Sequence, residues 1–145
     1  MLRLLHLPFV MGKYLQSLND MIVFDALIYN VDRHFGNFGF LVDSHSNQIV
    51  APAPLFDHGN SLFNFAALDA IGDPAAMRKY AKTLLPCVYD DFVDEARKAV
   101  SHDLRNALRK LLDFKFKRHR KYNLDTKRLS MLEQMVSQRA KDILE

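Results

Sequence analysis

The feature that most constrains the fold is a segment, residues 14–30, that has the pattern of a helix and is apolar on almost every side. Its core stripe repeats at spacings of three and four, the period of an α-helix, with further apolar residues between: Leu15, Leu18, Met21, Ile22, Val23, Phe24, Ala26, Leu27, Ile28 and Tyr29. We expect such a helix inside a domain, covered on most sides. Asn30 is its expected end, because asparagine tolerates the left-handed conformation found there.

The residues after this helix predict a loop, a β-hairpin and a second loop. Residues 32–37 are polar and contain glycine, as is typical of a loop. Residues 38–42 and 48–51 have the composition of two short strands, and residues 43–47 form the turn between them. Two prolines then exclude regular structure across residues 52–59.

The remainder of the chain has a helical pattern. Asp73 is expected to cap a helix and Pro74 to occupy its first turn. Apolar stripes predict further helices near 92–100 and 104–112, and a last one from about Asp125. We therefore expect the 145 residues to form a single, mostly α-helical α+β domain with about five helices and one short hairpin.

The composition is that of an ordinary globular protein, with 49% hydrophobic and 26% charged residues. The formal charge of +3 does not identify a partner. A single cysteine, Cys87, excludes a disulfide within the chain and fits a reducing compartment. His6 and Pro8 interrupt the apolar start, and no run approaches the ~20 residues that cross a membrane. We expect a cytoplasmic protein without membrane contact.

Three side chains in the two loops point to phosphoryl transfer: Asp32, Asn37 and Asp57. This chemistry needs Mg²⁺ to neutralise phosphate charge and a carboxylate to receive the proton of the attacking hydroxyl. Mg²⁺ prefers hard oxygen ligands, which aspartate and asparagine supply. The hairpin is expected to fold Asp57 back toward Asn37. Each residue alone is also explained by turn or capping roles, so the combination within one short segment carries the hypothesis.

The residues around these side chains resemble the catalytic segment of HipA-like kinases. The two stretches are NVDRHFGNFGFL at 30–41 and APLFDHGNS at 53–61. Phosphoinositide kinases share a similar Asp-Arg-His-x-x-Asn loop, whereas in ordinary protein kinases the His and Arg precede the Asp. The resemblance implies that Asp32 is the catalytic base and that Asn37 and Asp57 hold Mg²⁺. It also implies transfer of the ATP γ-phosphoryl group to a protein Ser or Thr hydroxyl.

Four neighbouring residues are candidates for supporting roles. Arg33 and His34 orient the loop, contact phosphate, or serve only to pack the loop. Asp25 is either a buried hydrogen-bonding partner of the loop or an exposed residue. His58, also considered as loop support, stands where ordinary protein kinases have Phe. The glycines of the two loops are expected to permit positive backbone dihedrals or close packing.

Kinases also need a β-rich lobe with a Gly-rich flap and a strand lysine that pairs with the phosphates. Neither pattern is found here, and Lys13 lies on or beside the first helix. Three interpretations stay open: a truncated or split kinase, a non-catalytic remnant that binds other proteins, and a nucleic-acid-associated module. Loss of a lobe would expose apolar surface, so we expect a protein partner or a homodimer to cover it.

A basic segment, residues 115–121, is the sequence feature that favours the interpretation as a nucleic-acid-associated module. We interpret it as a solvated helix end, where cations favour the helix dipole. No stacking aromatics and no known nucleic-acid module accompany it, so nucleic acid is not an expected partner. No His/Cys pair has the spacing of a zinc site, and no Gly-x-Ser-x-Gly elbow indicates a serine hydrolase.

Overall fold

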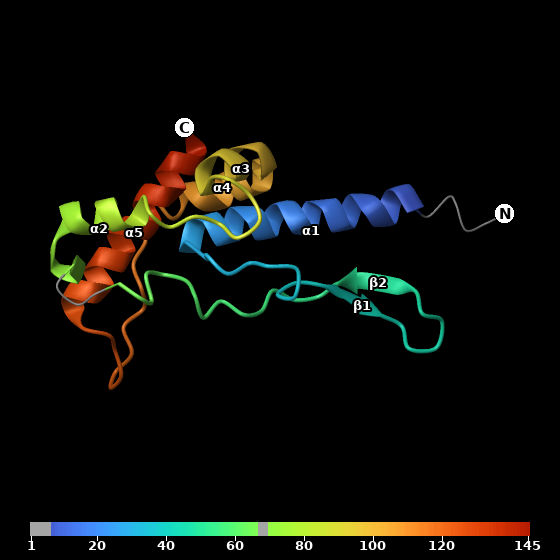
Figure 1. The fold of residues 1–145 in the computed structure, drawn as a ribbon, viewed down its shortest axis with the longest axis horizontal. Helices are drawn as coiled ribbons and strands as arrows, with labels where there is room; N and C mark the ends of the chain where they lie inside the picture. Colours follow the sequence, from blue (N-terminus) through green and yellow to red (C-terminus); the bar gives the residue numbers. More distant parts are fainter. Residues whose placement is uncertain (1–6, 67–69) are drawn as a thin grey trace.

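The computed structural model describes residues 7–66 and 70–145 as helices joined to one small hairpin (Figure 1). The elements are α1 (Leu7–Ile28), β1 (Phe40–Val42), β2 (Ile49–Pro52), the 3₁₀ helix η1 (Ala70–Gly72), α2 (Pro74–Ala81), α3 (Phe92–Ala99), α4 (His102–Arg109) and α5 (Thr126–Leu144). Helices make up about half of the chain, and the two strands pair antiparallel. The predicted α+β class, with five α-helices and one hairpin, is confirmed for these residues.

In the part of the long helix α1 whose burial is described, residues 12–28, the buried side chains lie from Met21 onward. In Figure 1, helices α3, α4 and α5 lie around the C-terminal end of α1 and α2 lies farther along α5, while the other end of α1 extends beside the hairpin. Met21, Val23 and Ala26 are buried, whereas Leu15 is 61% exposed. The expectation of a helix covered on most sides is therefore correct from Met21 onward and wrong for the preceding turns.

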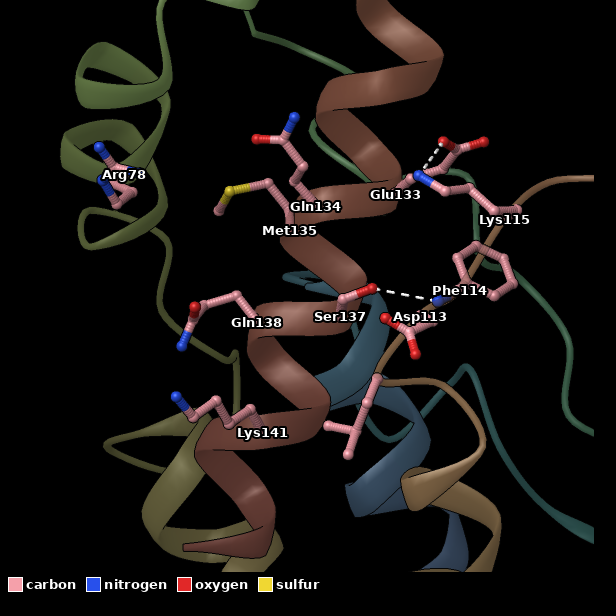
Figure 2. Close-up of a pocket in the computed structure, with 11 residues that line it drawn as sticks. Arg78, Asp113, Phe114, Lys115, Glu133, Gln134, Met135, Ser137, Gln138 and Lys141 are labelled. Carbon is pink, nitrogen blue, oxygen red and sulfur yellow. Dashed lines mark hydrogen bonds and ion pairs between the residues drawn. The ribbon is translucent and has the colours of Figure 1, made fainter.

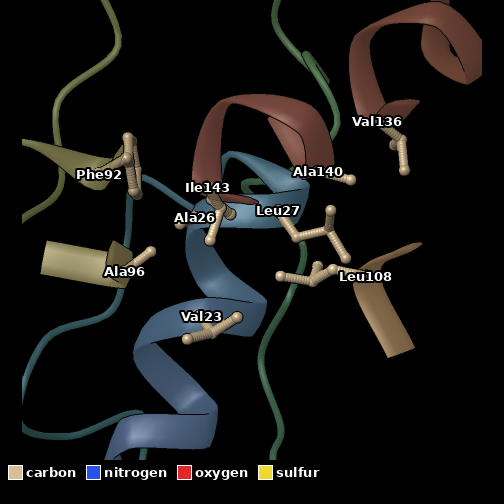
Figure 3. Close-up of a cluster of buried hydrophobic side chains, with 9 residues drawn as sticks. All are labelled: Val23, Ala26, Leu27, Phe92, Ala96, Leu108, Val136, Ala140 and Ile143. Atoms are coloured by element: carbon tan, nitrogen blue, oxygen red, sulfur yellow. The ribbon is translucent and has the colours of Figure 1, made fainter. Parts of the chain in front are cut away.

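The main hydrophobic core lies where α1 crosses α3, α4 and α5. Figure 3 shows the nine buried side chains that meet there: Val23, Ala26, Leu27, Phe92, Ala96, Leu108, Val136, Ala140 and Ile143. Three of them are alanines with no exposed surface, and their small side chains let the helices approach closely. Burying one large apolar side chain stabilises the fold by roughly 1.5–3 kcal/mol, so this cluster fixes the end of α1.

A second core cluster joins α5 to α2 and η1. Its buried members are Tyr29, Phe63, Ala66, Ile71, Met77, Ala81, Met131, Leu132 and Met135. Tyr29, which directly follows α1, packs on Phe63 with ring centroids 4.4 Å apart. The start of the first loop is therefore held in the interior.

Capping side chains mark the starts of the later helices. The carboxylate of Asp73 accepts a hydrogen bond from the backbone N–H of the second residue of α2, and Pro74 is the first residue of that helix, as predicted. Asp91 caps α3, Ser101 caps α4 and Asp125 caps α5 in the same way. These short polar residues explain why the helices begin where they do.

The end of α1 differs from the prediction. The helix stops at Ile28, and the residue in the left-handed conformation is Tyr29, with φ 56°, not Asn30. Asn30 is fully buried, and its side chain hydrogen bonds within the interior. The asparagine is therefore needed as a hydrogen-bonding side chain and not as a helix terminator.

The hairpin packs beside the exposed half of α1. Phe40 pairs with Pro52 across the strands, and its ring lies 4.8 Å from that of Tyr14. A further hydrogen bond, from Ala53 N to Gly39 O at 2.9 Å, extends the pairing toward the loops. The hairpin thus brings the segments on its two sides together.

The basic segment 115–121 lies in the connection between α4 and α5, outside any helix. The interpretation as a helix end is therefore wrong. Lys115 and Arg118 form ion pairs with Glu133 at 3.1 and 2.9 Å. An aromatic pair also accompanies the segment, because the exposed ring of Tyr122 stacks on His119.

Candidate functional site

The buried centre of the two-loop region is Arg33, whose surface is only 1% exposed. Its Nε donates to Asp25 Oδ2 at 2.8 Å, and its Nη2 donates to Asp25 Oδ1 at 2.9 Å. Asp25 comes from α1 and is fully buried. A buried guanidinium requires a paired charge, and this two-point contact supplies one. Of the two positions considered for Asp25, the structure has the buried one.

The same guanidinium joins the two loops. Its Nη1 donates to the backbone carbonyl of Asn37 and, at 2.8 Å, to the carbonyl of Phe56, which directly precedes Asp57. Its Nη2 lies 3.1 Å from His58 Nδ1. Arg33 therefore links residues 30–37 to residues 53–60, through contacts that span 23 and 25 residues of sequence.

The first loop orients Asp32 and Asn37 through side-chain hydrogen bonds. Asn37, 5% exposed, donates its amide to the backbone carbonyl of Asp32 at 2.9 Å. One of the two N–H groups of this amide is thereby used, and Asn37 Oδ1 accepts no hydrogen bond from the described residues. Asp32 Oδ2 accepts a hydrogen bond from Asn60 of the second loop at 2.7 Å. The Asp32 carboxylate is thus also tied across the two loops.

Asp57 is exposed and has an unusual backbone conformation. Its φ of 56° lies in the left-handed region, which is rare for residues other than glycine. Its carboxylate forms no hydrogen bond or ion pair with residues 7–66 or 70–145. Strained residues of this kind are concentrated at functional sites, where the surroundings hold them in place.

Of the remaining sequence candidates, His34 has a local role and His58 contacts α1. His34 is exposed, and its Nδ1 accepts a hydrogen bond from Gly36 N at 3.0 Å. A Cβ at Gly36 would lie 2.9 Å from Cε1 of the exposed His34 ring, so that ring would have to shift. None of the described glycines has a positive φ, so that part of the expectation is wrong. His58 packs edge-on against Phe24 with centroids 5.2 Å apart.

Two asparagines of this network were not among the site residues predicted from sequence, where Asn30 was expected only to end the first helix and Asn60 had no assigned role. Asn30 donates to Asp25 Oδ1 at 2.9 Å and accepts from Asp32 N at 3.3 Å. Asn60 binds the carboxylate of Asp32. Both asparagines lie within the two motif stretches. Their side-chain amides can donate and accept hydrogen bonds at the same time, and this property is the sequence signal that could have identified them.

The arrangement offers hard oxygen donors that differ in exposure: Asp57 is exposed, Asp32 is half-buried and Asn37 is buried. These are the Asp32 and Asp57 carboxylates and Asn37 Oδ1. The described residues contain no cluster of three or more His, Cys, Asp or Glu side chains arranged for a metal. A hollow of about 590 Å³, shown in Figure 2, lies elsewhere, between α5, Arg78 and the segment 112–115. The chemical candidates are therefore on the loops and not in that hollow.

Comparison with known proteins found a similarity to a serine/threonine kinase. A 44-residue segment is 50% identical to serine/threonine-protein kinase CtkA of Helicobacter pylori strain J99, and covers 30% of this chain. The matched segment spans 13% of the length of that kinase. No family model matches, and no solved structure matches. Part of this chain is therefore similar to part of a serine/threonine kinase.

Within residues 7–66 and 70–145, no helix combines the length and the hydrophobicity that a membrane crossing requires.

Proposed function

We propose that this chain is the catalytic lobe of a HipA-like kinase, which transfers the γ-phosphoryl group of ATP to a serine or threonine hydroxyl of a protein. The observation that carries the proposal is the bridge from Arg33 to the carbonyls of Asn37 and Phe56. It supports the convergence of loops that a phosphotransfer site requires. The partial similarity to a serine/threonine kinase points in the same direction.

In this proposal Asp32 is the catalytic base. It accepts the proton of the attacking hydroxyl while that oxygen bonds to the γ-phosphorus and the bond to ADP breaks. Asn60 holds Asp32 Oδ2, and Oδ1 makes no hydrogen bond with the described part of the chain. That oxygen is the proton acceptor. Positioned proton transfer of this kind contributes ~10²–10⁴-fold to a rate.

Asn37 and Asp57 fit a Mg²⁺ ion, because each has a hard oxygen without a hydrogen-bond donor from the described residues. When bound, Mg²⁺ supplies charge neutralisation to the phosphates of ATP. Arg33 fixes the main chain at both positions. This preorganisation limits the movement needed to bind Mg²⁺ and nucleotide.

A protein partner is part of the proposal. Large apolar side chains are exposed on the hairpin, its flanks and the uncovered half of α1: Leu15, Phe40, Leu41, Val42, Ile49, Val50, Leu55 and Phe56. Exposed apolar surface of this kind usually marks an interface. A nucleotide-gripping lobe on a partner, or a second copy of the chain, is the expected occupant. The same surface favours the second candidate function, a non-catalytic lobe that binds proteins.

Calorimetric titration of the full chain with ATP, with and without Mg²⁺, tests the proposal. Mg²⁺-dependent binding that is lost in Asp57→Asn supports the kinase assignment. A folded chain that binds no nucleotide, alone or with its partner, supports the interaction module instead. Analytical ultracentrifugation of the same samples reports self-association.

A further inference from the structure

A second hollow lies between α2, α3 and α5, with a volume of about 350 Å³. This is within the range of small-molecule sites. Three cationic side chains line it, those of Arg78, Lys82 and Arg139. None of its lining residues belongs to the loops 30–37 and 53–60, so it is separate from the site described above.

Arg139 is the unusual member of this hollow. Its side chain is only 8% exposed, and its guanidinium carbon lies 3.8 Å from the ring centroid of Tyr29 and 5.6 Å from that of Phe92. Its buried Nε has no hydrogen-bond partner. No carboxylate of the described chain lies within 4.0 Å of it. Contact with the rings offsets part of the cost of burying this charge, but an unpaired buried donor still indicates an absent acceptor.

The acidic residues at the rim do not neutralise this charge. The carboxylate of Asp91 caps α3 through the N–H groups of the second and third helical residues, at 2.7 and 2.9 Å. Asp142 Oδ1 accepts a hydrogen bond from Gln138 at 2.7 Å. Arg78 and Lys82 form no ion pair with the described residues. Figure 2 shows Arg78 on α2 facing the α5 residues Met135 and Gln138, which also line this hollow.

We propose that the hollow binds a small phosphomonoester that carries an apolar or aromatic group. The phosphate is held by Arg139 and Lys82, and the apolar group lies against Leu84 and Leu85 of the same hollow. A phosphomonoester has a charge of about −1.5 to −2 at neutral pH, which suits three cations better than a carboxylate does. Arginine binds phosphate through two parallel N–H groups, and stacks on aromatic rings, as Arg139 does here.

The experiment is calorimetry of the full chain with phenyl phosphate, compared with inorganic phosphate and benzoate. Phenyl phosphate should bind more tightly than either comparator. Arg139→Met should weaken it at least about tenfold, and Lys82→Met several-fold, because phosphate contacts to charged groups are strong. Lys79→Met is the matched control, since Lys79 is an exposed lysine of α2 outside the hollow, and it should bind like the wild type.

Arg139 packs on the core, so circular dichroism must show that Arg139→Met is folded. If Arg139→Met is not folded, the proposal is tested by comparing phenyl phosphate binding by Lys82→Met and Lys79→Met. Amide chemical-shift mapping of the wild type with phenyl phosphate is the second measurement. Shifts around Leu84, Asp91 and Arg139 support the site. No binding, equal binding by all variants, or shifts confined to the basic segment 115–121 overturn it. Asp57→Asn should leave phenyl phosphate binding unchanged, so this proposal and the kinase proposal fail separately.

Discussion

Arg33 and Asp25 form a two-point ion pair in the interior of the chain, with N–O distances of 2.8 and 2.9 Å. The pair fixes the first loop to α1. It also leaves Nη1 of Arg33 to bind the carbonyls of Asn37 and Phe56. This buried side chain therefore contributes to the relative position of the two candidate loops, together with the hydrogen bond from Asn60 to Asp32. The contribution can be tested by changing Arg33.

Arg33→Met should lower the free energy of unfolding by about 3–5 kcal/mol, because it leaves the buried carboxylate of Asp25 without its charge partner. Urea unfolding followed by circular dichroism measures this loss. Arg109→Met is the matched control, since Arg109 is exposed and makes a single hydrogen bond, to Asn106. Equal stability of the two variants would mean that the ion pair does not anchor the loop.

Asp32→Asn should reduce phosphotransfer by ~10²–10⁴-fold, which corresponds to roughly 3–5 kcal/mol of barrier, while the fold is kept. The physical reason is that an amide cannot accept the proton of the attacking hydroxyl. The measurement is single-turnover transfer from ATP in the active complex, with Asp103→Asn of the exposed face of α4 as the control. Full activity of Asp32→Asn would remove this residue from the role of base.

Much of the fold could be predicted from sequence because its elements depend on local patterns. Asp73 and Pro74 start α2 as expected, and the hairpin lies where the two apolar runs predicted it. The burial of α1 could not be predicted, because it depends on how far the other helices extend along it. Leu15 has the same apolar character as Met21, yet only Met21 is covered.

The candidate site was only partly predictable. The sequence motif places Asp32, Asn37 and Asp57 in two neighbouring loops. For Arg33, which links the loops in the structure, the sequence does not decide between three possible roles. The contacts of Arg33 join residues more than 20 positions apart, and local periodicity contains no information on them. The left-handed conformation is expected at Asn30 or at the glycines, but in the described residues it occurs at Tyr29, Asn47, Asp57, Leu62 and Phe63, because tertiary contacts override local preference.

The backbone conformation of Asp57 predicts opposite effects on stability and nucleotide binding. Asp57→Gly should raise the free energy of unfolding by about 1 kcal/mol, since glycine adopts a φ of 56° without steric cost. It should also abolish Mg²⁺-dependent ATP binding, because the carboxylate is lost. Asn47→Gly is the control, since Asn47 has φ 53° in the exposed hairpin turn. If both variants bind Mg²⁺·ATP like the wild type, Asp57 is not a metal ligand.

Glu133 makes the stability of the α4–α5 connection dependent on pH. Desolvation raises the pKa of this carboxyl group, but hydrogen bonds from Lys115 and from the backbone N–H of Phe116, with the charge of Arg118, outweigh it and lower the pKa overall. Hydrogen bonds from Ser46 also lower the pKa of Asp43 in the hairpin turn, so the wild type has more than one such group. A variant is needed to isolate the part due to Glu133.

A carboxyl group whose folded pKa lies below its unfolded value of about 4.3 stabilises the fold above that value, and this contribution is lost as the pH falls through the folded pKa. Glu133→Gln should therefore be less stable than the wild type at neutral pH, and the difference should shrink below about pH 4. Urea unfolding from about pH 7 to about pH 3 measures it, with Glu145→Gln at the exposed C-terminus as control. A difference that stays constant across this range would show that packing around Glu133, and not its charge, holds the connection in place.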